Sequence, residues 1–271
     1  MKSLDTVIET FRIVLKNPKI MLIPFIIFVL FFVFIFAIAI GTIGNIAFGE
    51  LSKDIFLSRF LILLLLILII SILISPIFNG MLISSGIQAM KRKISLTKAF
   101  NEAKKKYFSI LGISLVGIGI LIFLILIPFI FIIPFKWMGE TLLTVLLILY
   151  LIFAVIVGIF ILILLFEANT IVFTENKKAF DALKRSFYIG EQKALSIIAT
   201  MFFLFIIVFG ITLFVKIFDL VFTFIDNVIG FPIFSFLFLI LVEIPVNCLI
   251  SSVNGILPVV FYYNYNLKKL K

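Results

Sequence analysis

The polar residues that could do chemistry in this chain gather in its last long apolar block. Glu243 is the one ionisable side chain well inside such a block, and Asn247, Ser251 and Asn254 follow it at intervals of four, four and three residues. These intervals place all four on one face of a helix. Pro245 removes a backbone donor and frees a carbonyl, so we expect a kink beside Glu243.

Two interpretations of this polar stripe stay open. It could form hydrogen bonds between helices, with Glu243 kept protonated by its apolar setting. It could instead line a pathway for a proton, a cation or a polar headgroup, because charged side chains inside spans are costly and usually functional. An earlier apolar block offers polar or kink-forming partners: Ser71, Ser75, Pro76, Asn79, Ser84 and Ser85. We take Glu243, Asn247, Ser251, Asn254 and Asn79 as the candidate intramembrane site.

The chain has few of the residue types that support catalysis or bind metal ions. The chain has no histidine and a single cysteine, Cys248, which excludes Ser-His and Cys-His catalysis and histidine-metal sites. A phosphate-binding loop motif is absent. Glu167 and Glu175 are expected at a solvated inner boundary, and Asp219 and Asp226 outside the spans. We therefore expect a protein that is not an enzyme and binds no cofactor or metal.

The elements that position the stripe are membrane spans. The chain has 271 residues, of which 64% are hydrophobic and only 13% charged, whereas soluble domains are about half apolar and a quarter charged. A span needs about 20 apolar residues. Six segments qualify: Ile20–Ile40, Phe60–Phe78 with a helical continuation through Gly86, Ile110–Ile133, Leu142–Phe166, Leu195–Val215 and Phe231 to about Val260. The predicted fold is an all-α polytopic bundle of six transmembrane helices.

Basic residues orient this bundle. Nineteen of the 23 Lys and Arg residues lie before span one, between spans two and three, between spans four and five, or in the tail. The other side has Lys53, Arg59, Lys136 and Lys216. The positive-inside rule then places both termini in the cytoplasm of a cell-membrane protein. It also explains the net charge of +10 without nucleic acid.

Three cytoplasmic segments resemble one another. Residues 98–105 (KAFNEAKK) recur as residues 178–185 (KAFDALKR), and residues 3–15 match them more faintly. Their apolar positions fall on one helix face, Leu4, Ile8, Phe11 and Leu15 in the first segment, Leu96, Phe100, Ala103 and Tyr107 in the second, and Phe180, Leu183 and Phe187 in the third. We expect three parallel units within one membrane domain, about 1–94, 95–174 and 175–271, each a cytoplasmic amphipathic helix followed by a transmembrane hairpin.

Such helices can lie in the inner membrane interface. Their basic faces would meet anionic headgroups through Arg12, Lys16, Lys104, Lys105, Lys184 and Arg185, at about 1 kcal/mol for each cation. Alternatively, the helices simply pack on the bundle and satisfy the positive-inside bias. A membrane-protein partner or a second copy of the chain could also use this surface.

Short motifs in the third segment and the tail carry a family resemblance. Glu175 with residues 182–186 (ALKRS), and the aromatic end of the last span, residues 261–266 (FYYNYN), resemble the membrane domain of glycerophosphodiester phosphodiesterases and the YciC-like group of uncharacterised membrane proteins. In many relatives an Asp stands near that tail, where this chain has Asn. The resemblance implies a six-helix bundle with cytoplasmic amphipathic linkers. The soluble catalytic barrel of the phosphodiesterases is missing, so their activity is not implied.

The first functional hypothesis is therefore an accessory or structural membrane protein that engages anionic lipid or a membrane partner through its basic helices. The alternative is a small-solute or lipid transporter that uses the stripe around Glu243. A polar cavity lined by Glu243, Asn247 and Asn79 would favour transport, whereas a solid bundle would favour the accessory protein.

Overall fold

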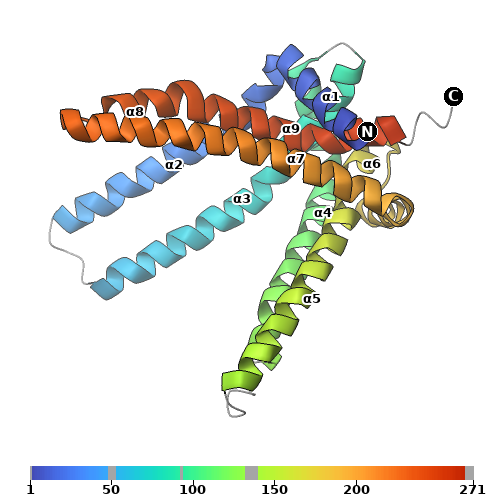
Figure 1. Cartoon of the computed structure of the whole chain (residues 1–271), viewed down its shortest axis with the longest axis horizontal. Helices are drawn as coiled ribbons and strands as arrows, with labels where there is room; N and C mark the ends of the chain where they lie inside the picture. Colours follow the sequence, from blue (N-terminus) through green and yellow to red (C-terminus); the bar gives the residue numbers. More distant parts are fainter. Residues whose placement is uncertain (1, 48–52, 92–93, 132–139, 266–271) are drawn as a thin grey trace. The chain divides into compact units, whose positions relative to one another are not determined.

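A computed structural model describes residues 2–47, 53–91, 94–131 and 140–265, and within these ranges the chain is helical and has no strand (Figure 1). Its elements are α1 Lys2–Lys16, the 3-10 turn η1 Pro18–Met21, α2 Leu22–Ala47, α3 Lys53–Met90, α4 Leu96–Phe131, α5 Glu140–Phe166, α6 Ala168–Thr174, α7 Ala179–Ile229, α8 Ile233–Phe238, the π-helical turn η3 Leu239–Glu243 and α9 Ile244–Tyr265. Some basic and tail residues counted in the sequence lie outside the described residues: Arg92, Lys93, Lys136, Asn266, Lys268, Lys269 and Lys271.

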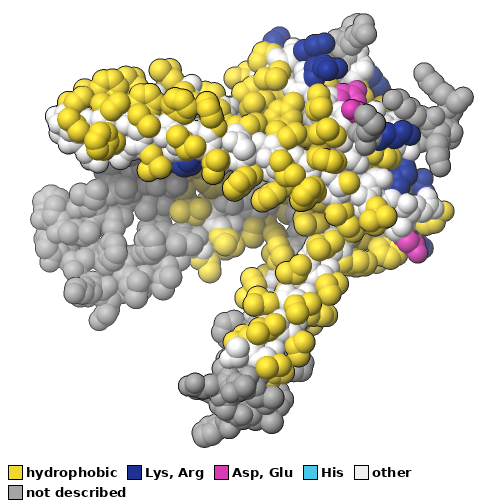
Figure 2. Space-filling model, in the orientation of Figure 1, with side chains coloured by type: hydrophobic (Ala, Val, Ile, Leu, Met, Phe, Trp, Pro, Cys, Tyr) yellow, Lys and Arg dark blue, Asp and Glu magenta, His cyan; other side chains and the backbone are white. Residues whose placement is uncertain are grey.

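The helices have the length and surface of membrane spans. In the described ranges, five of them are long and apolar enough to cross a membrane, or up to six if the bent pair of α1 and residues 18–34 counts as one span. Their large aliphatic and aromatic side chains are exposed on most sides, as Figure 2 shows along α7 and α8. A helix that is apolar all round belongs in a core or a bilayer. The predicted all-α polytopic membrane fold is confirmed.

The first helix turns sharply into the first span. α1 and the segment after it meet at 89°. Pro18 has no N–H with which to continue α1, and the Asn17 side chain donates a 2.8 Å hydrogen bond to the carbonyl of Ile13 in the last turn. α1 is therefore a separate helix that crosses the direction of α2.

The other two amphipathic segments are joined to spans. The second forms the beginning of α4, which continues to Phe131 as one helix. The third opens α7, whose backbone leaves helical geometry only at Lys193 (φ −129°, ψ 17°). α7 then runs on to Ile229, well past Val215, where the sequence predicted the end of span five. The part after the kink is about 54 Å long at 1.5 Å per residue, longer than the roughly 30 Å of a hydrocarbon core.

Contacts divide the chain into two compact units. The first comprises residues 1–105 and 200–271, and the second comprises residues 106–199. Both boundaries fall inside helices, at Lys105 in α4 and Thr200 in α7. This division follows packing and differs from the three units seen in the sequence, which remain a prediction.

The first unit has a tightly packed core where α1, α2, α3 and α9 meet. Its buried cluster includes Val14, Ile20, Leu82, Val253 and Ile256. From this core the α2–α3 hairpin and the hairpin of α7 with α8 and α9 extend and separate from one another (Figure 1). The core therefore sits at one end of the unit.

Two glycines let α3 and α9 approach closely in that core. A Cβ added at Gly255 would lie 2.6 Å from Cδ1 and 3.0 Å from Cβ of Leu82. A Cβ at Gly86 would lie 3.1 Å from Cγ2 of Ile256. Small residues permit this kind of close helix contact in membranes, so the crossing of α3 and α9 depends on both.

A glycine also permits a close helix contact in the second unit. Gly190 of α7 lies against Ile163 of α5, since an added Cβ would come within 2.6 Å of the Ile163 Cγ2 atom. The Tyr150 hydroxyl of α5 donates to the carbonyl of Leu124 in α4, which joins these two spans inside the apolar region. A buried donor that reaches a backbone carbonyl avoids the cost of an unmade hydrogen bond.

Candidate intramembrane polar site

Four of the five residues of the candidate intramembrane site line one pocket of the first unit. Asn247, Ser251 and Asn254 of α9 and Asn79 of α3 border a cavity of about 600 Å³. α2 supplies an apolar wall to the same cavity through Pro24, Ile27, Phe28 and Phe31. We call this cavity the amide groove. Helix periodicity brings its α9 residues together, whereas packing of α3 against α9 adds Asn79.

The polar side chains of the amide groove have no partner in the described part of the chain. No hydrogen bond or ion pair joins any of the four to another described residue, and all four are exposed to the cavity. Each carries donors and acceptors that must be satisfied. In hydrocarbon an unmade hydrogen bond costs several kcal/mol, so these side chains call for water or a polar ligand wherever the groove is shielded from solvent.

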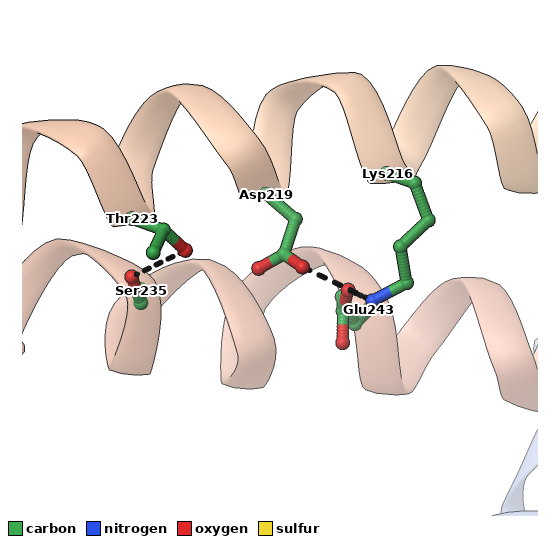
Figure 3. A network of polar contacts seen from close by, with 5 residues as sticks. All are labelled: Lys216, Asp219, Thr223, Ser235 and Glu243. Carbon is green, nitrogen blue, oxygen red and sulfur yellow. Dashed lines mark hydrogen bonds and ion pairs between the residues drawn. The ribbon is translucent and has the colours of Figure 1, made fainter.

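Glu243 does not line the amide groove. Its carboxylate Oε1 lies 2.9 Å from Nζ of Lys216 on α7, and the same ammonium lies 3.1 Å from Oδ2 of Asp219. Figure 3 shows Lys216 reaching between the two carboxylates, with Thr223 and Ser235 nearby at 3.4 Å from one another. Glu243 is thus part of an ion cluster between α7 and η3, which we call the Lys216 cluster.

The backbone explains where Glu243 points. Pro245 cannot donate to the carbonyl four residues before it, and the preceding residues Leu239–Glu243 adopt a π-helical turn. Such a turn adds a residue to the helix and changes the direction of the side chains on it. The expected kink therefore takes the form of a π-turn, and Glu243 faces α7 rather than the groove.

The Lys216 cluster lies beyond Val215, where the sequence predicted the end of span five. Lys216 and Asp219, both expected on the far side of that span, lie on the continuous helix α7. The Lys216 side chain is 59% exposed and that of Glu243 only 13% exposed. Because one ammonium bridges two carboxylates, each acid is partly neutralised without leaving the helix pair.

Asp226 closes the turn of the same hairpin, between α7 and α8. Its carboxylate oxygens accept hydrogen bonds from the backbone N–H groups of Phe234 (2.9 Å) and Ser235 (2.7 Å) at the start of α8. Gly230, with φ of +78°, supplies the left-handed residue of the turn. Asp226 is therefore a buried residue of α7 that caps the start of α8, and its position outside the spans stays a prediction.

Two of the α3 serines expected near Glu243, Ser71 and Ser84, bond to other partners, and the hydroxyl of Ser85 is buried without a partner among the described residues. Ser84 donates to the carboxylate of Glu102 on α4, and Gln88 donates to the hydroxyl of Ser84 at 3.1 Å. Gln88 in turn accepts from the N–H of Ser95, 2.9 Å away, at the start of α4. This chain of hydrogen bonds ties the end of α3 and the start of α4 together within the first unit. Ser71 bonds to the carbonyl of Ile67 in its own helix.

A buried carboxylate in the second unit escaped the sequence argument. Glu167, between α5 and α6, is 1% exposed, although it was expected at a solvated boundary. Its neighbours Ala168 and Ile171 are fully buried as well. The segment after Glu167 forms the short helix α6, and the hydrophobic periodicity used to find long spans does not predict so short a helix.

Each amphipathic segment buries small side chains and exposes some of its large apolar ones, whereas Leu183 is buried and Leu4, Phe11, Leu96 and Tyr107 are half-buried. In α1, Ser3, Val7 and Val14 are buried whereas Ile8 and Leu15 are exposed. In α4, Ala99 and Ala103 are buried whereas Phe100 and Phe108 are exposed, and in α7, Ala182 and Ser186 are buried whereas Phe180 and Phe187 are exposed. Exposure reaches 83% for Phe108 and 80% for Phe180.

The predicted headgroup cations are mostly open to a ligand. Arg12, Lys16, Lys104, Lys105 and Lys184 are exposed. Arg185 differs, because its Nε lies 3.3 Å from Oε1 of Glu175 and its guanidinium carbon lies 5.6 Å from the Tyr188 ring centroid. Five of the six cations therefore keep free surface, and the sixth is held by a carboxylate.

Within the described ranges, no group of three or more acidic or cysteine side chains is placed to hold a metal ion. The geometry of the Lys216 cluster is that of an ion-pair network inside a helix hairpin.

No protein family, curated protein or solved structure matches this chain. The resemblance of the Ala182–Ser186 segment to phosphodiesterase membrane domains therefore remains a prediction.

Proposed function

We propose that this chain is a non-enzymatic accessory protein of the cell membrane that engages anionic lipid at the cytoplasmic face. In this proposal both termini are cytoplasmic, as the basic segments indicate. The amphipathic segments contact the inner leaflet, and their cations meet its headgroups.

The observation that carries the proposal is the use of the two faces of these segments. If they served only to pack on the bundle, all of their large apolar side chains would be buried. Instead each segment keeps two of them exposed, beside buried ones such as Leu183: Ile8 and Leu15, Phe100 and Phe108, and Phe180 and Phe187. Burying one Phe side chain is worth about 1.5–3 kcal/mol, so an exposed pair on each segment favours contact with acyl chains.

The charges support the same interpretation. Arg12 and Lys16 are exposed on the helix that carries Ile8 and Leu15, and Lys184 is exposed beside Phe180. An exposed apolar face next to exposed cations is the pattern of helices that lie in an interface with anionic lipid. Each cation adds about 1 kcal/mol near such a surface.

Spin labelling tests this placement directly. Cys248, the single native cysteine, is replaced by Ala, and a nitroxide is attached at position 180 or, as the matched control, at the exposed position 181, about 100° around the same helix. In nanodiscs the label at 180 should collide with oxygen and be shielded from a water-soluble nickel complex, and the label at 181 should behave oppositely. If both labels meet the nickel complex equally, the segment is not in the interface.

Lipid preference is the second test. The purified protein in mixed nanodiscs should retain phosphatidylglycerol over phosphatidylcholine when its bound lipids are measured by native mass spectrometry. Replacing Lys104 and Lys105 with Gln should reduce that preference by about fivefold for each cation. Equal retention of both lipids by the unaltered protein contradicts the proposal.

Transport of a small solute or lipid is the second candidate, and the amide groove is the observation that favours it. The groove contains Asn79 and Asn247 but not Glu243, so the groove itself offers no titratable carboxylate for proton coupling. Uptake into proteoliposomes that depends on Asn247 would support transport. Unchanged uptake in an Asn247→Leu variant would remove this site from any transport pathway.

A further inference from the structure

We infer that the amide groove binds one amphiphile with an uncharged polar end, the class of a diacylglycerol or another neutral glycerolipid. The polar end lies among Asn79, Asn247, Ser251 and Asn254, and the acyl chain lies between α2 and α3. This site is distinct from the cationic surface of the proposed function and does not depend on it.

The first argument is the hydrogen-bonding capacity of the groove. Three amides and one hydroxyl converge on a cavity of about 600 Å³, and none has a partner among the described residues. Cavities of this size hold small-molecule ligands. Hydroxyl and ester groups satisfy amide donors and acceptors in the same way that another amide would.

The second argument is the absence of charge. No described residue lining the groove is charged. A phosphate transferred from water to such a setting would lose its hydration without meeting a cation, and that cost is prohibitive for an unpaired ion. A neutral hydroxyl or ester end pays no such penalty, so the groove discriminates against phospholipid headgroups.

The third argument is an apolar pocket that adjoins the groove. It has a volume of about 180 Å³ and shares Ile27 and Phe31 of α2 with the groove. Its described lining is entirely aliphatic and aromatic: Ile27, Leu30, Phe31, Phe34, Ile67, Ile70, Ile74 and Phe78. A polar cavity that continues into an apolar one fits a molecule with a polar end and a hydrocarbon tail.

The two cavities follow one another along the helices in the order that such a molecule requires. On α3, Asn79 at the polar end is twelve residues from Ile67 at the apolar end, which is about 18 Å. On α2, Pro24 lies in the groove and Phe34 in the apolar pocket, about 15 Å apart. Lys19 lies five residues before Pro24, so the polar end is nearest the basic end of the span.

Photolabelling of the whole protein in nanodiscs tests the inference. The probe is a diacylglycerol with a diazirine in one acyl chain, and labelled peptides are located by mass spectrometry. We expect saturable labelling of residues 22–34 and 65–78, competed by unlabelled diacylglycerol. Phosphatidylglycerol at the same mole fraction should compete at least tenfold less well.

Variants separate a specific site from lipid that merely surrounds the protein. Asn247→Leu and Asn254→Leu keep a similar volume and should each reduce saturable labelling about fivefold, the effect of one lost hydrogen bond. Asn227→Leu, an exposed Asn of α7 outside the groove, is the matched control and should leave labelling unchanged. Ile74→Trp, which fills the apolar pocket without touching the amides, should reduce labelling as well.

Several results would overturn the inference. Equal competition by phosphatidylglycerol shows a site that accepts charged headgroups. Competition by free glycerol as strong as that by diacylglycerol shows a small-solute site with no use for a tail. Labelling that persists unchanged in both Asn→Leu variants and in Ile74→Trp, with each variant melting at the temperature of the unaltered protein, shows unspecific contact with bulk lipid.

Discussion

Replacing Gly255 with Ala tests the helix crossing that brings Asn79 to the α9 side of the amide groove. The added Cβ would lie 2.6 Å from Cδ1 and 3.0 Å from Cβ of Leu82. The Leu82 Cδ1 atom can rotate away, but its Cβ is fixed to the backbone of α3. α3 and α9 must therefore move apart, and overpacking of this kind costs about 1–3 kcal/mol.

A second glycine isolates that cost. Ala is more favourable than Gly inside a helix by about 0.8–1.0 kcal/mol, and this gain applies at Gly255 as elsewhere. At Gly210 on α7 nothing lies within 4 Å of an added Cβ, so Gly210→Ala receives the gain alone. The difference in unfolding free energy between the two variants should equal the packing cost, about 1–3 kcal/mol. Gly86→Ala should fall between them, since its added Cβ meets the terminal Cγ2 of Ile256 at 3.1 Å.

The assay is reversible unfolding in mixed micelles with increasing dodecyl sulfate, followed by circular dichroism. We expect the dodecyl sulfate fraction at the unfolding midpoint to be highest for Gly210→Ala, intermediate for Gly86→Ala and lowest for Gly255→Ala. If the Gly255 and Gly210 variants unfold at the same detergent fraction, then α3 and α9 do not touch at Leu82. The geometry assigned to the groove would then be wrong.

Three further perturbations probe the polar contacts. Lys216→Met leaves two carboxylates without their cation, so it should destabilise the α7 hairpin. A double-mutant cycle with Glu243→Gln should give a coupling free energy of about 0.5–3 kcal/mol. Additive effects of the two changes would contradict the ion pair. Asp226→Ala removes the acceptor of two N–H groups at the start of α8 and should lower the melting temperature. Asp226→Asn keeps an acceptor oxygen and should lower the melting temperature less. Equal effects of the two changes would argue against capping. Ser84→Ala should cost about 1–3 kcal/mol because Glu102 loses a buried donor, and an unchanged denaturation midpoint would exclude that hydrogen bond.

Much of the fold was readable in the sequence because a bilayer restricts what a chain can do. An uncharged run such as residues 142–166 has to be a helix, since only a helix satisfies its own backbone groups in hydrocarbon. The structure gives α5 as Glu140–Phe166. The separation of α1 from the first span was also readable, because Pro18 cannot continue a helix. The length of α7 could not be predicted from the sequence, because a single charged residue such as Lys216 in an apolar run does not indicate whether the helix ends there.

In the candidate site, too, some features follow from local sequence and others depend on packing between helices. The chain alone determined that Asn247, Ser251 and Asn254 share a face, because helix periodicity is a local property. It could not determine that Glu243 leaves that face, because the π-turn before Pro245 and the ammonium of Lys216 on a distant helix decide this together. The positions of Asn79 and of the apolar wall of α2 were decided only by tertiary structure, since they depend on how closely Gly255 lets two helices approach. Contacts between helices in lipid are set by the fit of side chains across the interface, and that fit is a property of pairs of segments rather than of either one.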